Sequence, residues 1–268
     1  MSVPALLLNK VVVITGASQG IGRGIAVGAA NQGAHVVVHH LGTTQTTQDA
    51  LALLQELIQV RSNLGLDGTA AIEVAGDISD EQTSDKIVEV AVNQFGRIDC
   101  CVSNAGVCPF YTFLDIPHDV WRMTRSINLD GAFYFVQACA RQMKEQTPQG
   151  GSIVAVSSIS ALVGGGLQAH YTPTKAGVKS MMESCAISLS PFNIRCNSVL
   201  PGTIETPINQ QDLADKDKRA YMEKRIPLGR LGKPEDLAGP TIFLLSDMAQ
   251  YVTGASVLVD GGAFVNLQ

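Results

Sequence analysis

Tyr171 and Lys175 are four residues apart in a stretch with helical periodicity, so the phenol and the ammonium would lie on one helix face. A phenol has a pKa of about 10, and a neighbouring positive charge lowers it by favouring the phenolate. Ser158 follows a β-branched run thirteen residues before Tyr171 and could hydrogen-bond a substrate oxygen near that phenol. These three side chains would perform acid/base chemistry on a hydroxyl or carbonyl group. An isolated Tyr-x-x-x-Lys is equally compatible with an ordinary helix.

A second motif, G-x-x-x-G-x-G, runs from Thr15 to Gly22, directly after a predicted strand and at the start of a predicted helix. Backbone N–H groups at a helix N-terminus can hold a pyrophosphate when no side chain blocks its approach. The motif predicts a dinucleotide site, and a tight packing turn is the alternative. The predicted contacts are Gly16, Ser18, Gln19, Gly20, Ile21 and Gly22.

The cofactor choice between NAD and NADP stays open. The end of the second predicted strand, His39 to Thr44, contains no acidic residue for a ribose 2′-hydroxyl and no Arg or Lys for a 2′-phosphate. Arg23 could reach a 2′-phosphate or lie solvated on its helix. We assign His39 to the cofactor site from its place at this strand end.

Along the chain, short β-branched runs alternate with amphipathic stretches. This alternation predicts the βαβ units that must position these groups. Right-handed crossovers then give an α/β fold: a single-domain Rossmann-type, doubly wound, seven-stranded parallel sheet with helices on both faces. The predicted strands are 11–15, 35–39, 70–75, 98–103, 152–157, 194–199 and 256–259, and the predicted helices are 20–31, 46–61, 81–95, 118–144, 172–190 and 234–246.

One domain is expected to span residues 1–268. Residues 204–230 are polar and fit neither period, so we expect a mobile substrate lid there. The net charge of −5 argues against nucleic acid as a partner, because phosphate binding needs a basic field. The first ten residues lack the basic start of a signal peptide, and no window reaches the roughly 18 apolar residues of a membrane span.

The six cysteines form no C-x-x-C pair, which argues against both a metal site and a disulfide framework. We interpret them as reduced thiols in or near the core. Together with the missing signal peptide, this predicts a cytoplasmic enzyme.

From end to end the chain resembles the short-chain dehydrogenase/reductase family. Beyond the glycine loop, the matching motifs are Gly76-Asp77-Ile78 for the adenine, Asn104-Ala105-Gly106 at the sheet end, and Pro201-Gly202-Thr203-Ile204 with Thr206 for the nicotinamide carboxamide. The resemblance implies a catalytic tetrad of Asn128, Ser158, Tyr171 and Lys175. In it Tyr171 is the acid/base, Ser158 orients the substrate, Lys175 binds the nicotinamide ribose, and Asn128 supports a proton-relay water. It also implies a homotetramer.

Within that family, residues 157–165, 170–177 and 260–268 resemble the fungal sugar dehydrogenases that oxidise the anomeric carbinol of L-rhamnose to a lactone. The turn 191–193 departs from the Gly-rich turn common in the family and leaves that loop uncertain. An aldose needs several directed hydrogen bonds. The polar candidates are Ser160, Gln168, His170, Thr203 and Asn209, and the apolar candidates for the sugar methyl group are Val107, Pro109 and Phe110.

Two alternatives share these motifs. A reductase of ketones or 3-oxoacyl thioesters would use the same tetrad, and the basic residues between Lys216 and Arg225 could dock an acidic carrier, although interleaved acids cancel most of that field. A non-catalytic dinucleotide sensor would need only the fold. An intact tetrad argues against the sensor.

Overall fold

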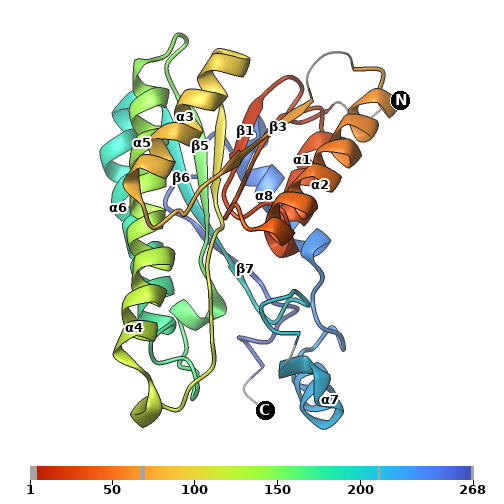
Figure 1. Cartoon of the computed structure of the whole chain (residues 1–268), viewed down its shortest axis with the longest axis vertical. Helices are drawn as coiled ribbons and strands as arrows, with labels where there is room; N and C mark the ends of the chain where they lie inside the picture. Colours follow the sequence, from red (N-terminus) through yellow and green to blue (C-terminus); the bar gives the residue numbers. More distant parts are fainter. Residues whose placement is uncertain (1–4, 67–69, 211, 267–268) are drawn as a thin grey trace.

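The seven strands of the computed structural model, which describes residues 5–66, 70–210 and 212–266, form one parallel sheet (Figure 1). The strand order is β3-β2-β1-β4-β5-β6-β7. The predicted fold is confirmed. The strands are β1 Val11–Ile14, β2 His35–His40, β3 Ala71–Ala75, β4 Cys100–Ser103, β5 Gly151–Val156, β6 Ile194–Pro201 and β7 Ser256–Val259.

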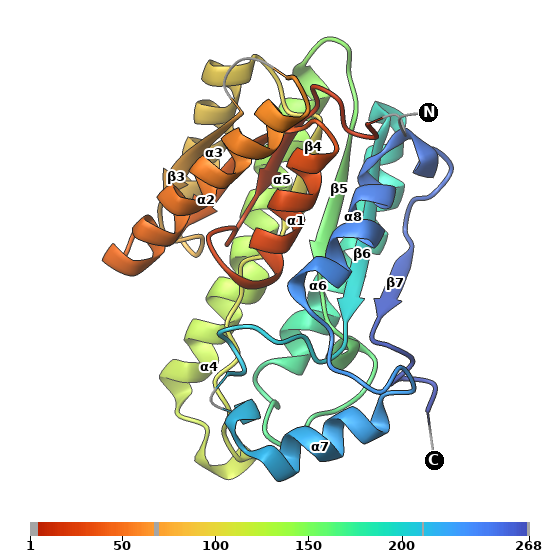
Figure 2. The ribbon, with the colours of Figure 1, turned by 90° about the vertical axis from the view of Figure 1, so that its right-hand side faces the viewer.

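Helices cover both faces of the sheet (Figure 2). On one face α1, α2 and α8 pack on alternate strand residues such as Val12 and Val36, and on the other α3, α5 and α6 pack on Val11, Val13 and Val37. Both sides of the central strands are therefore buried, as in other parallel sheets. The helices are α1 Gly20–Asn31, α2 Thr44–Asn63, α3 Glu81–Phe95, α4 His118–Arg125, α5 Gly131–Glu145, α6 Thr172–Leu189, α7 Lys216–Arg225 and α8 Ala238–Leu245.

The long helix predicted over 118–144 is interrupted. One π-helical turn, Ser126–Asp130, joins α4 to α5. Gly131 follows it against the carbonyl of Ile78, where a Cβ would lie 2.7 Å from that oxygen. The apolar spacing continues through the turn, so the sequence pattern does not reveal it.

The prediction that segment 204–230 lacks regular structure is wrong for ten of its residues. They form α7, which begins after Asp215, whose carboxylate accepts the N–H groups of Asp217 and Lys218. The helix is strongly polar and buries no residue, so it has no apolar periodicity to detect. Gln211 of this segment, like residues 1–4 and 267–268, lies outside the described residues.

The turn after α6 contains residues 191–193, which depart from the Gly-rich turn common in the family. A 3₁₀ turn, Ser190–Phe192, leads to Asn193 at φ 58°. Asn tolerates this left-handed conformation better than most residues with a side chain, so it replaces glycine in the turn.

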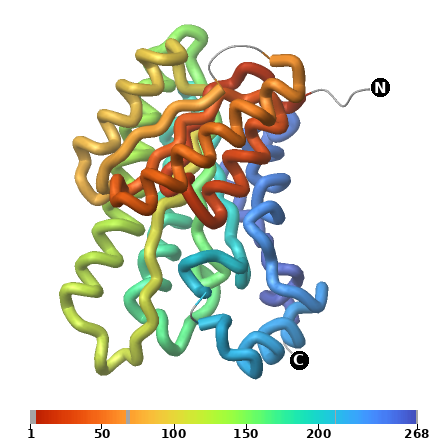
Figure 3. The backbone as a smooth tube through the Cα atoms, turned by 45° about the vertical axis from the view of Figure 1, so that its right-hand side comes forward, coloured from red at the N-terminus to blue at the C-terminus, as the bar shows by residue number. Residues whose placement is uncertain are grey.

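The site lies where the strands end. The glycine loop follows β1, Asn104 follows β4, Ser158 follows β5, and residues 202–206 follow β6. The order of the sheet reverses between β1 and β4, and ligands of such sheets bind at that crevice. Figure 3 shows α4, the chain after β6 and the C-terminal residues gathered at this end of the molecule.

Candidate active site

A cavity of about 880 Å³ runs along the carboxyl ends of the strands. It brings together residues from the glycine loop, the ends of β2 to β6 and the start of α6. Among the predicted site residues, Gly22 and Asn128 and the substrate candidates Pro109 and His170 do not line it. Those that do are Gly16, Ser18, Gln19, Gly20, Ile21, His39, Asp77, Ile78, Asn104, Ala105, Gly106, Ser158, Ser160, Gln168, Tyr171, Lys175, Pro201, Gly202, Thr203, Ile204 and Thr206.

The glycine loop needs glycine at two positions for different reasons. Gly16 has φ 62°, which residues with a side chain rarely adopt. At Gly22 a Cβ would lie 2.4 Å from the Gly16 oxygen and 2.6 Å from Asn104 Nδ2. Asn104 Nδ2 donates to the carbonyls of Thr15 and Gly16 at 2.9 and 3.0 Å, so it holds the loop from the neighbouring strand. Gly22 therefore shapes the loop rather than facing a ligand.

The start of α1 fits a dinucleotide pyrophosphate. Gln19 caps the helix without a side-chain hydrogen bond, and the first turn contains no acidic residue. Gly20 lines the cavity at φ 56°, and a Cβ there would point toward Thr206. The free N–H groups and positive end of the helix dipole therefore face a cradle that side chains leave open.

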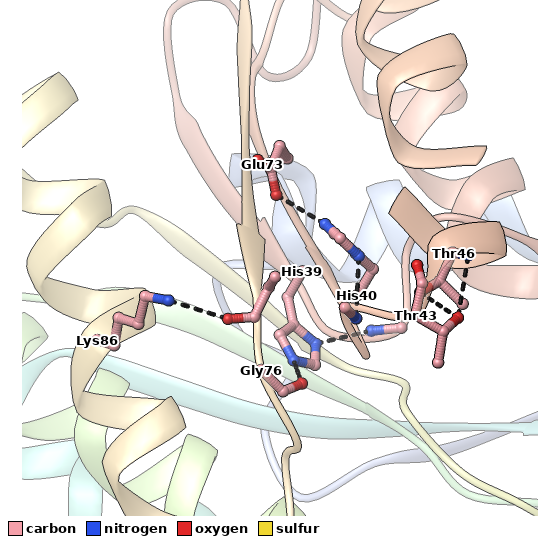
Figure 4. Close-up of polar contacts among 10 residues, drawn as sticks. His39, His40, Thr43, Thr46, Glu73, Gly76 and Lys86 are labelled. Carbon is pink, nitrogen blue, oxygen red and sulfur yellow. Dashed lines mark hydrogen bonds and ion pairs between the residues drawn. The ribbon is translucent and has the colours of Figure 1, made fainter. Parts of the chain in front are cut away.

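At the adenosine end of the cavity, charged groups near the end of β2 have partners within the protein, as Figure 4 shows for Glu73 and Lys86. His40 Nε2 lies 2.6 Å from a carboxylate oxygen of Glu73, so this acid is directed at His40. Arg23 donates to Glu56 at 2.5 Å and does not line the cavity, so it is not poised for a 2′-phosphate. Asp77 lies exposed beside the site and accepts from the N–H and hydroxyl of Ser79.

Tyr171, Lys175 and Ser158 meet as predicted. Tyr171 and Ser158 line the same cavity, where Ser158 lowers the pKa of the Tyr171 hydroxyl, and Lys175 Nζ lies 5.7 Å from the centroid of the Tyr171 ring. Lys175 Nζ also donates to the carbonyl of Val156 at 2.9 Å, and Ser157 Oγ donates to the Lys175 carbonyl at 2.8 Å. The end of β5 thus positions both Ser158 and the ammonium.

The electrostatics of the pair differ from the expectation that Lys175 lowers the pKa of Tyr171. Burial raises the pKa of Tyr171 above its ordinary value, and the charge of a nearby Cys108 thiolate would raise it further, while the hydrogen bond to Ser158 lowers it. Burial also lowers the pKa of Lys175 to about 8. Burial opposes the charged form of both groups and is the largest cause of both shifts.

Asn128 lies in the π-helical turn with its amide fully engaged. Its Oδ1 accepts from the Val107 N–H at 2.8 Å, and its Nδ2 donates to the Val107 carbonyl at 2.9 Å and to Thr174 Oγ1 at 3.3 Å. The side chain therefore ties the loop after β4 to the start of α6. Its evident task is to position these segments around Tyr171.

The predicted substrate residues form a connected wall. Gln168 Nε2 donates to Cys108 Sγ at 3.3 Å, Ser160 Oγ donates to Gln168 Oε1 at 3.5 Å, and the Ser160 N–H donates to Ser158 Oγ at 3.0 Å. His170 is fully buried, bonds the Pro109 carbonyl at 2.7 Å and does not line the cavity. His170 is therefore a packing residue and not a substrate contact.

Several cavity residues escaped the sequence reasoning. Some of them belong to the resembling stretches 157–165 and 260–268, but no motif assigns any of them to the cavity, so only the folded chain brings them together. They include Leu41, Cys108, Val163, Asp212, Lys218, Met222, Arg225, Ala263, Phe264 and Asn266. Asn209, one of the polar substrate candidates, also lines the cavity, and its Nδ2 donates to the Ile204 carbonyl at 2.7 Å.

This fold and site are those of a dinucleotide-binding oxidoreductase class. A protein-family profile described as enoyl-(acyl carrier protein) reductase matches residues 16–263. The crystal structure of a short-chain type dehydrogenase/reductase from Mycobacterium marinum is 33% identical, with a TM-score of 0.87 over 97% of each chain. The chain belongs to the short-chain dehydrogenase/reductase family, which confirms the predicted resemblance.

Within the family, the relatives that match almost the whole chain include two named for L-rhamnose oxidation. The L-rhamnose 1-dehydrogenase (NAD(P)(+)) of Azotobacter vinelandii is 56% identical over 98% of this chain and 100% of that protein. The L-rhamnose-1-dehydrogenase of the fungus Scheffersomyces stipitis is 54% identical over 98% of this chain and 99% of that protein. The resemblance to a fungal sugar dehydrogenase is confirmed as well.

Proposed function

We propose that this protein oxidises the C1 hydroxyl of L-rhamnose or a similar aldose to the lactone, with NAD or NADP as cofactor. The observation that carries the proposal is that Tyr171, Ser158, Lys175 and the glycine loop all line one cavity. The two near full-length relatives, both named for L-rhamnose oxidation at C1, support the substrate. The first of them is named for both cofactors.

The chain's own groups hold the sugar and move one proton. Ser158 hydrogen-bonds the C1 oxygen and keeps it within reach of the Tyr171 hydroxyl. Tyr171, as phenolate, takes the proton of the C1 hydroxyl. When bound, an oxidised nicotinamide would supply the acceptor for the hydride of C1, and its positive charge would favour the Tyr171 phenolate that burial opposes. Lys175, held by the Val156 carbonyl, adds its positive charge when protonated and is placed to bind the nicotinamide ribose.

The remaining predicted residues hold the ligands in place. The N-terminus of α1 with Ser18 to Ile21 would bind the pyrophosphate, Asp77 and Ile78 the adenosine, and residues 201–206 the nicotinamide end. Ser160, Gln168 and Thr203 would bind the other sugar hydroxyls. We also propose that residues 204–230 act as a lid that excludes water from the closed site.

Initial rates test the substrate. L-Rhamnose and a panel of aldoses are offered with NAD or NADP, and 3-oxoacyl thioesters and ketones with the reduced cofactors. We expect turnover of L-rhamnose with both cofactors and release of the lactone. Reduction of thioesters without oxidation of any aldose would refute the proposal. The cations of α7 give little support to docking of an acidic carrier, since Arg219 pairs with Glu205 at 2.6 Å and Glu223 at 2.9 Å, and Lys218 with Asp212.

We further propose a homotetramer in the cytoplasm. Large apolar side chains lie exposed on α4 and α5, including Trp121 and Phe133. Others lie exposed on α8 and just after it, including Phe243 and Tyr251. Two such faces would allow two kinds of subunit contact. All six cysteines are free thiols, which fits a reducing compartment. No helix among the described residues has the length and hydropathy to cross a membrane.

Sedimentation velocity tests the assembly. A tetramer is expected for the wild type, and Phe133→Glu should shift it toward smaller species. A monomer at micromolar concentration would refute the tetramer.

A further inference from the structure

His39 uses both ring nitrogens inside the protein. Its side chain is buried at the end of β2. Nδ1 accepts the N–H of Gly16 at 3.2 Å, and Nε2 donates to the carbonyl of Gly76 at 2.9 Å (Figure 4 shows the bond to Gly76). These two bonds require the neutral imidazole with its proton on Nε2. The ring lines the cavity, but its polar atoms are already satisfied by the chain.

The two partners of His39 belong to different parts of the dinucleotide site. Gly16 opens the pyrophosphate loop after β1, and Gly76 precedes Asp77 after β3. Backbone bonds run beside the ring, from the Ala17 N–H to the His39 carbonyl at 2.9 Å and from the Gly76 N–H to the His40 carbonyl at 3.0 Å. One side chain thus joins the loops at the ends of two strands that are not neighbours in the sheet.

The groups around the ring keep it neutral. Burial is the main cause that lowers the pKa of His39 to about 4, and the charges of His40 and Lys86 lower it while that of Asp77 raises it. These neighbours have partners of their own: His40 bonds Glu73, Lys86 donates to the Ala75 carbonyl at 3.1 Å, and Asp77 accepts from Ser79. A proton on Nδ1 would place two donors face to face at Gly16.

We propose that His39 is a positioning residue for the dinucleotide, which sets the distance between the pyrophosphate loop and the adenosine-binding turn by holding Gly16 and Gly76 at once. It binds no phosphate itself. Because neither bond depends on the ribose 2′ substituent, the same frame serves NAD and NADP alike. The inference rests on the proposed dinucleotide-dependent function but makes no use of the sugar.

Three variants at His39 separate the two bonds. His39→Asn places an amide oxygen near the position of Nδ1 and keeps the bond to Gly16. His39→Gln places an amide nitrogen near the position of Nε2 and keeps the bond to Gly76. His39→Phe keeps neither bond. Calorimetric binding of ADP, which has the adenosine and pyrophosphate but no nicotinamide, measures the effect without turnover. We expect ADP affinity to fall about threefold in His39→Asn and His39→Gln and at least tenfold in His39→Phe.

Asn197→Leu is the matched control. Asn197 is equally buried, and its amide also makes two bonds to backbone, to the Val252 carbonyl and from the Ala255 N–H, both at 3.0 Å, but it does not line the cavity. This variant should lose thermal stability and keep wild-type ADP affinity. If Asn197→Leu and His39→Phe weaken ADP binding equally, His39 has only a general structural role.

A kinetic split gives a second readout. In His39→Phe we expect the KM for the cofactor to rise at least tenfold, with kcat at saturating cofactor and the KM for the sugar within twofold of wild type. If His39→Phe does not fold, the Asn and Gln variants decide through ADP binding. Wild-type ADP affinity in the folded variants would overturn the inference. If the variants show the expected pattern of ADP binding but the wild type does not oxidise the sugar, only the proposed substrate is refuted.

Discussion

Burial controls the chemistry of the catalytic pair at the scale of single residues. It raises the pKa of Tyr171 and lowers that of Lys175 to about 8, so near neutral pH the protein alone holds a neutral phenol beside a largely protonated amine. For the proposed oxidation we therefore expect the phenolate to depend on positive charge supplied by the bound ligand. Proton removal would then require the oxidised cofactor.

Removal of the Tyr171 hydroxyl tests this role. We expect Tyr171→Phe to lower kcat by about 10²–10⁴, the usual contribution of a general acid or base, with dinucleotide affinity within about threefold of wild type. Stopped-flow or steady-state rates give kcat, and fluorescence titration with NADH gives the affinity. Ser160→Ala, one step away along the cavity wall, should retain far more activity. Unchanged turnover in Tyr171→Phe would exclude it as the acid/base.

The pH dependence of stability tests the neutral state of His39. In the folded protein the pKa of His39 is about 4, whereas the free group has a pKa of 6.5. Between pH 4 and pH 6.5, His39 is therefore mostly protonated in the unfolded chain and mostly neutral in the folded protein. The stabilisation is complete above pH 6.5 and is lost as the pH falls toward 4, by up to about 3 kcal/mol.

Urea unfolding of the cofactor-free protein from pH 7.5 to 4.5 measures that loss. His39→Asn, which does not titrate, should lose correspondingly less stability over the same range. Parallel curves for the two proteins would show that His39 is not held neutral.

At the scale of elements, close approach at one glycine governs the start of α1. A methyl group at Gly22 would press on the Gly16 carbonyl and Asn104. We expect Gly22→Ala to lower the free energy of unfolding by about 1–3 kcal/mol and to weaken NADH binding strongly, because the loop must shift. Gly239 in α8 is exposed, and a methyl group there would meet no atom within 4 Å outside its own helix and chain neighbours. The following Pro240 disfavours the helical conformation of a residue with a Cβ, which offsets the usual gain of Ala in a helix, so Gly239→Ala should change the free energy of unfolding by less than about 1 kcal/mol.

Chemical unfolding and NADH titration of both variants check this prediction. Equal stability of Gly22→Ala and Gly239→Ala would contradict the tight packing described for the loop.

The elements also show what a sequence can predict. The bounds of α1, α3 and β7 agree with the prediction, because apolar periodicity and glycine or Asp80 at the ends mark them. The π-helical turn and α7 escaped it, since the first keeps a helical pattern and the second has no apolar face. The glycine loop and the Tyr171–Lys175 pair are local motifs and were predictable, whereas Cys108 and Phe264 reach the cavity only through tertiary folding.

At the scale of the whole molecule, the cavity is lined by segments far apart in the chain. α7 lies over it with Lys218 and Arg225 among the lining residues, and Asn266 Nδ2 donates to the Arg225 carbonyl at 2.9 Å. The C-terminal residues therefore hold the end of α7. An apolar cluster of Leu213, Ile226 and Leu231 supports the same segment.

Limited proteolysis tests the proposed lid. Trypsin should cut the free protein within α7, where Lys216, Lys224 and other basic residues are exposed. We expect NADH together with L-rhamnose to slow this cleavage at least fivefold, measured by mass spectrometry of the fragments. Cleavage after residues outside 204–230 gives the internal control. The same α7 rate with and without ligands would show that the segment does not close.

The proximity of Gly20 to Thr206 has a kinetic consequence. The first residues beyond β6 rest on the pyrophosphate loop, with Thr206 Cγ2 3.4 Å from the place of a Gly20 methyl group. A sugar already beneath that segment would obstruct the passage of a dinucleotide, so we expect compulsory sequential addition, with the nucleotide first to arrive and last to depart. Product inhibition by NADH should then be competitive against NAD and noncompetitive against L-rhamnose, and random-order patterns would contradict it.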